Sequence, residues 1–142
     1  MGRSVALKGA PILVVEDDAF QGLDLALSLE EAGAIVIGPV SDVNDAILVA
    51  REGNCLAAIM DFRLGTRDAI ELGEELHRHH TPFIIHTAYD CAGRLPAQWH
   101  GCKLISKPAD IPGLIRTIAA LLRWKAINQT RHARLRPGPQ VT

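Results

Sequence analysis

The sequence predicts an α/β fold in which a five-stranded parallel sheet is covered by helices on both faces. Short apolar runs recur along the chain, a helical pattern fills each gap between them, and polar residues follow the runs. The runs are apolar throughout, which is typical of strands that are buried on both faces. The expected strands are 11–15, 34–40, 56–60, 82–87 and 103–106.

Apolar residues at helical spacing occupy the gaps between these strands. In the first gap, Phe20, Leu23 and Leu27 fall on one face of a helix. Three further stripes are formed by Val43, Ala46, Ile47 and Ala50, by Ala69, Leu72, Gly73 and Leu76, and by Ile111, Leu114, Ile115, Ile118 and Leu122.

The gap between Thr87 and Lys103 differs from the others. Gly93, Pro96 and Gly101 interrupt it. Because these residues leave room for about two turns at most, we expect a short and irregular fourth helix.

Composition describes an ordinary globular chain of one domain's length, 142 residues. The chain has neither an apolar run long enough to span a bilayer nor a secretory signal, so we expect a cytoplasmic protein. Cys55, Cys91 and Cys102 are odd in number and lack CxxC spacing, which favours reduced thiols over a metal site.

Charge divides the chain into a body and a tail. All sixteen acidic residues lie at or before Asp110, whereas Lys125, Arg131, Arg134 and Arg136 follow Trp124 without an acid. We expect an N-terminal extension at 1–9, one domain at 10–124 and a basic, disordered tail at 125–142. Because the tail is short, we expect a protein without an output domain of its own.

Polar side chains follow four of the five expected strands where each strand ends. Glu16, Asp17 and Asp18 follow the first strand, and Asp61 follows the third. Thr87 ends the fourth strand, Ser106 ends the fifth, and Lys107 comes directly after it. Because ligands of open parallel sheets bind outside the carboxyl ends of the strands, these groups are expected to form one site. The second strand ends without a charge and fits an outer position.

This set of residue types indicates phosphoryl chemistry. Clustered carboxylates suit Mg²⁺, which binds one or two carboxylates and keeps several waters. A carboxylate beside the metal is a possible nucleophile toward phosphorus. Thr87 and Lys107 would then contact the oxygens of the transferred group.

The stretches LVVEDD, MDFRLG, HTA and SKP together resemble the receiver domain of two-component response regulators over residues 10 to 123. The resemblance implies a flavodoxin-like (βα)5 fold with strand order 2-1-3-4-5. It implies that Asp61 is the phosphoacceptor, charged by a histidine kinase or a histidine phosphotransfer protein. The signal would then pass to an unknown downstream protein or onward by phosphorelay.

The resemblance also assigns roles to the other residues of the site. Glu16, Asp17, Asp61 and the backbone carbonyl of Arg63 match the ligands of Mg²⁺. Thr87 matches the switch hydroxyl and Lys107 the lysine that pairs with the phosphoryl group. Pro108 matches a proline that usually follows a cis peptide bond.

Three departures from the receiver pattern concern signal output. Leu104 occupies a position that usually carries an aromatic ring, and Gly65 replaces a common proline. The broken fourth helix weakens a surface through which many receivers signal. The segment PFIIHTAYD is similar to an alphaproteobacterial-type branch of receivers, in which Tyr89 would supply the missing ring.

The favoured hypothesis is therefore a phosphorylation-switched binding module that is not an enzyme and binds neither nucleic acid nor membrane. A homodimer through the last helix is permitted by its apolar residues. A degenerate receiver that serves as a scaffold remains open, because Leu104 and Gly65 depart from the pattern. A phosphatase of the haloacid dehalogenase type also remains open, although Asp61 follows the third strand and lacks the DxD spacing.

Overall fold

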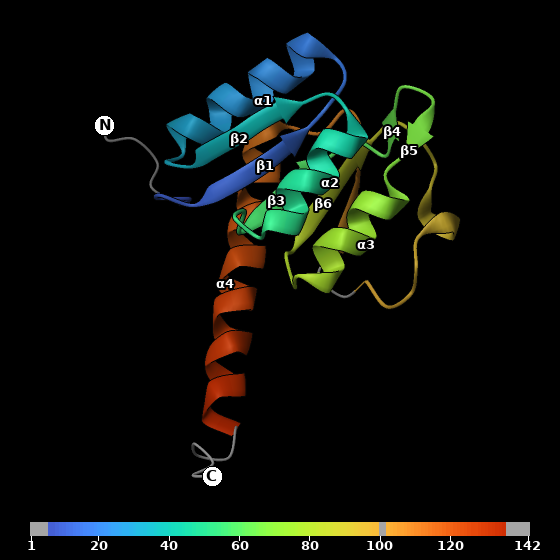
Figure 1. The fold of residues 1–142 in the computed structure, drawn as a ribbon. Helices are drawn as coiled ribbons and strands as arrows, with labels where there is room; N and C mark the ends of the chain where they lie inside the picture. The colour runs from blue at the N-terminus through green and yellow to red at the C-terminus, as the bar shows by residue number, and fades with distance from the viewer. Residues whose placement is uncertain (1–5, 100–101, 136–142) are drawn as a thin grey trace.

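The computed structural model describes residues 6–99 and 102–135 and shows a parallel sheet between two layers of helices (Figure 1). The sheet order is β2-β1-β3-β6-β7, which is the flavodoxin-like order expected from the resemblance. The adjacent strands pair in parallel throughout. The strands are β1 (Pro11–Val15), β2 (Ile35–Val40), β3 (Ala57–Met60), β6 (Phe83–Thr87) and β7 (Cys102–Ser106).

Two apolar clusters fill the spaces between the sheet and its helices. Alternation along β1 sends Leu13 and Val15 into one cluster and Ile12 and Val14 into the other. Helices α2 and α3 cover the first face, and α1 and α4 cover the second. Their bounds are α1 (Ala19–Glu31), α2 (Val43–Glu52), α3 (Ile70–Arg78) and α4 (Ile111–Leu135).

The expected short fourth helix is a single 3-10 turn, η1 (Ala92–Arg94). Trp99 fills the space beside it, with only 6% of its surface exposed. Its ring meets Phe83 edge-on at 5.4 Å and packs against Gly73, where any side chain would collide with it. A single buried indole therefore takes over the packing of the missing helix.

Helix α1 buries a different face from the one marked by Phe20, Leu23 and Leu27. These three side chains are exposed, Phe20 by 87%. The buried face instead contains Gly22, Leu25, Ala26 and Leu29. Small residues allow this close approach, because a Cβ on Gly22 would lie 2.9 Å from the ring of Pro39.

Both expected domain boundaries need correction. Leu7 is buried, and its N–H donates to the carbonyl of Ala32 at 3.0 Å, so the chain joins the domain before residue 10. Helix α4 continues to Leu135, which replaces a disordered tail by helix over 125–135 (Figure 1). The reason is that no proline or glycine interrupts the chain between Gly113 and Pro137. Residues 1–5 and 136–142 lie outside the described residues.

A two-stranded hairpin follows β3 and was not expected from the sequence. It is formed by β4 (Arg63–Leu64) and β5 (Arg67–Asp68), with Gly65 in the left-handed region at φ 65°. Strands of two residues are too short to produce a periodic pattern.

The three cysteines behave as small apolar residues. Burial raises the pKa of all three thiols, that of Cys102 to about 12. None of them is therefore a reactive thiolate at neutral pH. No helix in the described part of the chain is long and apolar enough to cross a membrane.

Candidate functional site

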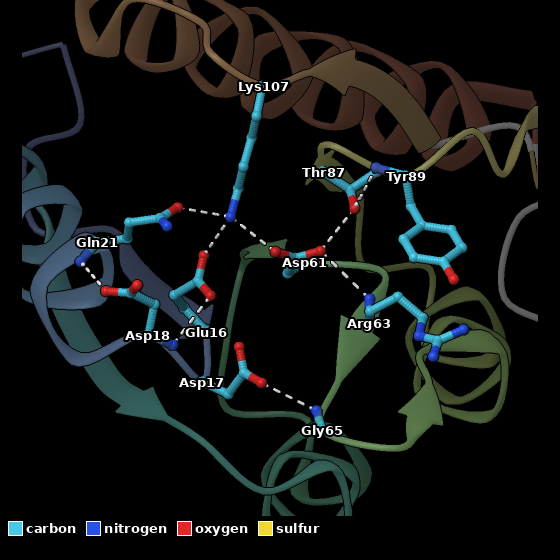
Figure 2. A network of polar contacts seen from close by, with 10 residues as sticks. All are labelled: Glu16, Asp17, Asp18, Gln21, Asp61, Arg63, Gly65, Thr87, Tyr89 and Lys107. Atoms are coloured by element: carbon cyan, nitrogen blue, oxygen red, sulfur yellow. Dashed lines mark hydrogen bonds and ion pairs between the residues drawn. The ribbon is translucent and has the colours of Figure 1, made fainter.

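The carboxylate of Asp61 lies at the carboxyl end of β3, between groups from three other strands (Figure 2). Lys107 Nζ donates to Asp61 Oδ2 and to Glu16 Oε1, each at 2.7 Å. All three side chains are largely buried, with exposed fractions of 9 to 14%. Residues that are far apart in sequence thus form one compact ion cluster, as the strand ends predict.

The other oxygen of Asp61 accepts two neutral donors. The Thr87 hydroxyl lies 2.6 Å from Asp61 Oδ1, and the Arg63 N–H lies 3.2 Å from the same atom. The Lys107 N–H also donates to the Thr87 carbonyl at 2.9 Å, which joins the ends of β6 and β7. The Lys107–Pro108 peptide bond is cis, as expected.

The two remaining acids of the first strand end face elsewhere. Asp17 is exposed and its Oδ2 accepts the Gly65 N–H at 2.9 Å, which fastens the hairpin to the end of β1. Asp18 caps α1 by accepting the Gln21 N–H at 3.0 Å. Its pKa is lowered, chiefly by that hydrogen bond. Asp18 is therefore the N-cap of α1.

Burial and pairing oppose each other at Glu16 and at Lys107, and the pKa values of both groups are raised. Desolvation raises the pKa of Glu16 and outweighs the hydrogen bonds from Lys107 and from the Asp18 N–H. Burial opposes the charge on Lys107, but its bonds to Asp61 and Glu16 outweigh burial and raise its pKa. The ammonium is therefore charged at neutral pH, whereas Glu16 holds its negative charge less readily than a free carboxyl.

On its other side, the site is bordered by contacts between arginines and aromatic rings. The Arg63 guanidinium lies 4.6 Å from the centre of the Tyr89 ring. Arg94 of η1 lies 5.1 Å from the Phe62 ring and pairs with Asp68 of the hairpin at 2.7 Å. These contacts join the hairpin to the loop after β6.

Sequence reasoning missed Gln21. Its Oε1 accepts from Lys107 Nζ at 2.6 Å, so the lysine has a third partner on α1 (Figure 2). The available signal was position alone: Gln21 lies in the first turn of the helix that follows the acidic run.

The donor chemistry of the site suits a divalent cation. Glu16, Asp17 and Asp61 offer hard oxygen atoms, and the Lys107 ammonium contacts two of these three carboxylates. Within the described ranges, no three acidic, histidine or cysteine side chains converge enough to hold a metal by themselves. A magnesium ion here would therefore depend on water and a backbone carbonyl for its remaining ligands.

The fold is similar to that of response regulator receiver domains in solved structures. The chain superposes on a response regulator receiver protein from Sinorhizobium medicae with a TM-score of 0.73 and 21% identity, covering 82% of this chain and 97% of that one. It superposes on the response regulator PhyR from Brucella abortus with a TM-score of 0.77 and 20% identity, covering 93% of this chain and 56% of that one. It superposes on the receiver domain of the hybrid histidine kinase CckA with a TM-score of 0.67 and 23% identity, covering 80% of this chain and 99% of that one.

Among curated proteins, the chain is similar to the transcriptional regulatory protein PdtaR of Mycobacterium tuberculosis. The two are 30% identical over 79 residues, which is 55% of this chain. The match spans only 38% of the length of PdtaR. No protein-family model matches the chain.

Proposed function

We propose that this chain is a phosphorylation-switched receiver module in which Asp61 accepts a phosphoryl group from a histidine kinase or a histidine phosphotransfer protein. The observation that carries the proposal is the placement of Lys107 Nζ 2.7 Å from Asp61 Oδ2, with the Thr87 hydroxyl 2.6 Å from Oδ1. A nucleophilic carboxylate is thus flanked by two donors suited to phosphoryl oxygens. The receiver fold gives independent support.

The transfer itself requires little covalent machinery from the protein. A carboxylate oxygen of Asp61 attacks phosphorus, and the P–N bond to the donor imidazole breaks as the O–P bond forms. The ring nitrogen leaves with the electron pair of that bond. Negative charge moves from Asp61 to the phosphoryl oxygens, where Lys107 and Thr87 are already positioned as donors.

Magnesium would be held by Glu16, Asp17, Asp61 and the backbone carbonyl of Arg63. When bound, it supplies positive charge that offsets the carboxylates and the phosphoryl oxygens. Lys107 Nζ, which donates to Asp61 Oδ2 at 2.7 Å, would supply a second positive charge. Because the Gly65 N–H donates to Asp17, the same carboxylate also links the metal site to the hairpin.

The modified site favours a different arrangement of the loop that follows Thr87. Phosphorylation removes the negative charge of Asp61, so the Thr87 hydroxyl exchanges a carboxylate partner for a phosphoryl oxygen. The Tyr89 N–H donates to the Thr87 hydroxyl oxygen at 3.2 Å, which carries this change into the loop. The output is a protein–protein contact or a phosphorelay step.

The test is intact-mass spectrometry after incubation with acetyl phosphate and Mg²⁺. Wild type is expected to gain one phosphoryl group. It should gain none when Mg²⁺ is chelated before incubation. Asp61→Asn should gain none, whereas the matched control Asp90→Asn, at an exposed acid near the site, should label like wild type.

Two outcomes would contradict the proposal. An unlabelled wild type would favour a degenerate scaffold, and equal labelling of Asp61→Asn would place the phosphoryl group elsewhere. Sustained turnover of a small phosphate ester would instead favour a phosphatase.

A further inference from the structure

Gln21 completes a closed ring of hydrogen bonds around Lys107 (Figure 2). Lys107 Nζ donates to Gln21 Oε1 at 2.6 Å and to Glu16 Oε1 at 2.7 Å. Glu16 Oε2 accepts the Asp18 N–H at 3.2 Å, and Asp18 Oδ1 accepts the Gln21 N–H at 3.0 Å. The path from lysine to glutamate, through the helix cap, to glutamine and back to lysine therefore closes.

We propose that Gln21 is a positioning residue that fixes the Lys107 ammonium for phosphoryl acceptance at Asp61. This inference rests on the proposed function and adds a residue that the receiver motifs do not assign. Gln21 acts through Lys107 and does not touch the reacting carboxylate.

The count of donors and acceptors supports this role. An ammonium has three N–H donors and no acceptor, and Lys107 directs them to Glu16, Asp61 and Gln21 at 2.6 to 2.7 Å. The amide must present its oxygen to the ammonium, because its NH₂ group can only donate. Gln21 is thus the only neutral member of the three acceptors.

A neutral acceptor has a specific advantage at this position. When Asp61 becomes an acyl phosphate, its carboxyl group loses the charge that holds Lys107. Glu16 and Gln21 still hold Nζ on the α1 side of Asp61, so the ammonium stays close to the phosphoryl oxygens. A carboxylate in place of Gln21 would hold Lys107 equally well but would repel the incoming anion.

The backbone of Gln21 is held as firmly as its side chain. The Asp18 cap fixes the first turn of α1, and the hydrogen bond to the Gln21 N–H lowers the pKa of Asp18. The helix start therefore sets the direction from which Gln21 reaches Lys107. A donor held in this way, the Lys107 ammonium, needs no rearrangement as charge develops.

The test compares Gln21→Leu with Gln98→Leu, which makes the same chemical change at an exposed position of the loop after η1. The rate constant for labelling by acetyl phosphate with saturating Mg²⁺ is expected to fall about three- to tenfold in Gln21→Leu, the range for the net contribution of one ordinary hydrogen bond. Gln98→Leu should label at the wild-type rate. Gln21→Glu should also label slowly, because it adds a negative charge beside the incoming phosphoryl group.

A spectroscopic readout separates positioning from a general effect on folding. In wild type, the Nζ protons of Lys107, observed through the ¹⁵Nζ signal, should exchange slowly with solvent, because all three N–H donors are hydrogen-bonded. These protons should exchange faster in Gln21→Leu and should still exchange slowly in Gln21→Glu.

Labelling of Gln21→Leu at the wild-type rate, or unchanged Lys107 exchange, would overturn the inference while leaving the proposed function intact. A wild type that takes no phosphoryl group would instead refute the proposed function itself.

Discussion

The two sides of Asp61 are built differently. On the Lys107 side, an ammonium is shared by Glu16, Asp61 and Gln21 within 2.7 Å, and the ring closes through the cap of α1. On the hairpin side, the contacts are the Arg63–Tyr89 stacking at 4.6 Å and the Arg94–Asp68 pair, whose side chains are half exposed.

Under the proposed function, this difference separates phosphoryl transfer from signal output. The Lys107 side is buried and charge-assisted, which suits a group that must be in place before the phosphoryl group arrives. The hairpin side depends on exposed contacts that individually contribute little and are easily exchanged. Two of the departures from the receiver pattern, Gly65 and the shortened fourth helix, fall on the hairpin side, whereas Leu104 lies on β7, the strand that leads to Lys107.

The largest effect is expected for Lys107→Met, which keeps an unbranched side chain, removes the charge and tests the role of the Lys107 side. Labelling of Asp61 by acetyl phosphate should fall about 100-fold, the loss typical of removing one preorganised donor at a developing charge. The measurement is the initial rate by intact mass. Lys103→Met, at an exposed lysine of β7, is the matched control. A loss of less than about threefold in Lys107→Met would show that the Lys107 side does not carry the chemistry.

A second prediction concerns His86, which lies on the strand beside Lys107. Its Nε2 is buried and is the one side-chain polar atom of the described residues found buried without a hydrogen-bond partner. His86→Leu should therefore stabilise the domain by about 1–2 kcal/mol in urea unfolding at pH 7. A destabilised variant would mean that a bound water satisfies Nε2.

The stability of the wild type should also depend on pH through the same group. Burial, and then the charge of Lys107, hold the pKa of His86 below its ordinary value. The unfolded chain therefore binds the proton first as the pH falls through the ordinary histidine pKa, and stability decreases toward the folded pKa. This loss should be smaller in His86→Leu. Equal slopes for the two proteins would contradict the pKa direction.

The smallest effect is expected on the hairpin side. Tyr89→Ala removes the ring beneath Arg63 and should change the rate of Asp61 dephosphorylation by about two- to fivefold, the equivalent of one exposed cation–π contact. Tyr89→Phe keeps the ring and should behave like wild type. The measurement is the decay of the phosphorylated mass after acetyl phosphate is removed. A change as large as that in Lys107→Met would remove the distinction between the two sides.

The convergence around Asp61 was predictable because it follows from sheet topology. Parallel strands end at one edge, so Glu16, Asp61, Thr87 and Lys107 had to meet if the strands were assigned correctly. The apolar runs fixed that assignment, since β1, β3 and β6 are buried on both faces. The site was thus specified by strand ends that a single sequence reveals.

Helix orientation and helix length were harder to predict. Helix α1 has two candidate apolar faces, and the face marked by the larger side chains, Phe20, Leu23 and Leu27, is the exposed one. Periodicity alone does not show that Gly22 must be buried to admit Pro39. The length of α4 was underestimated because basic composition was interpreted as disorder, although the helix-forming residues continue to Leu135.

The measurement that tests the central claim most directly is ¹⁹F NMR of the protein with beryllofluoride, a phosphoryl mimic, and Mg²⁺. The account predicts protein-bound fluorine signals in wild type that disappear without Mg²⁺ and in Asp61→Asn. The Lys107→Met variant should bind the mimic much more weakly than Tyr89→Ala. Bound signals that persist in Asp61→Asn, or their absence from wild type, would contradict the claim that Asp61 and Lys107 form a phosphoryl-accepting site.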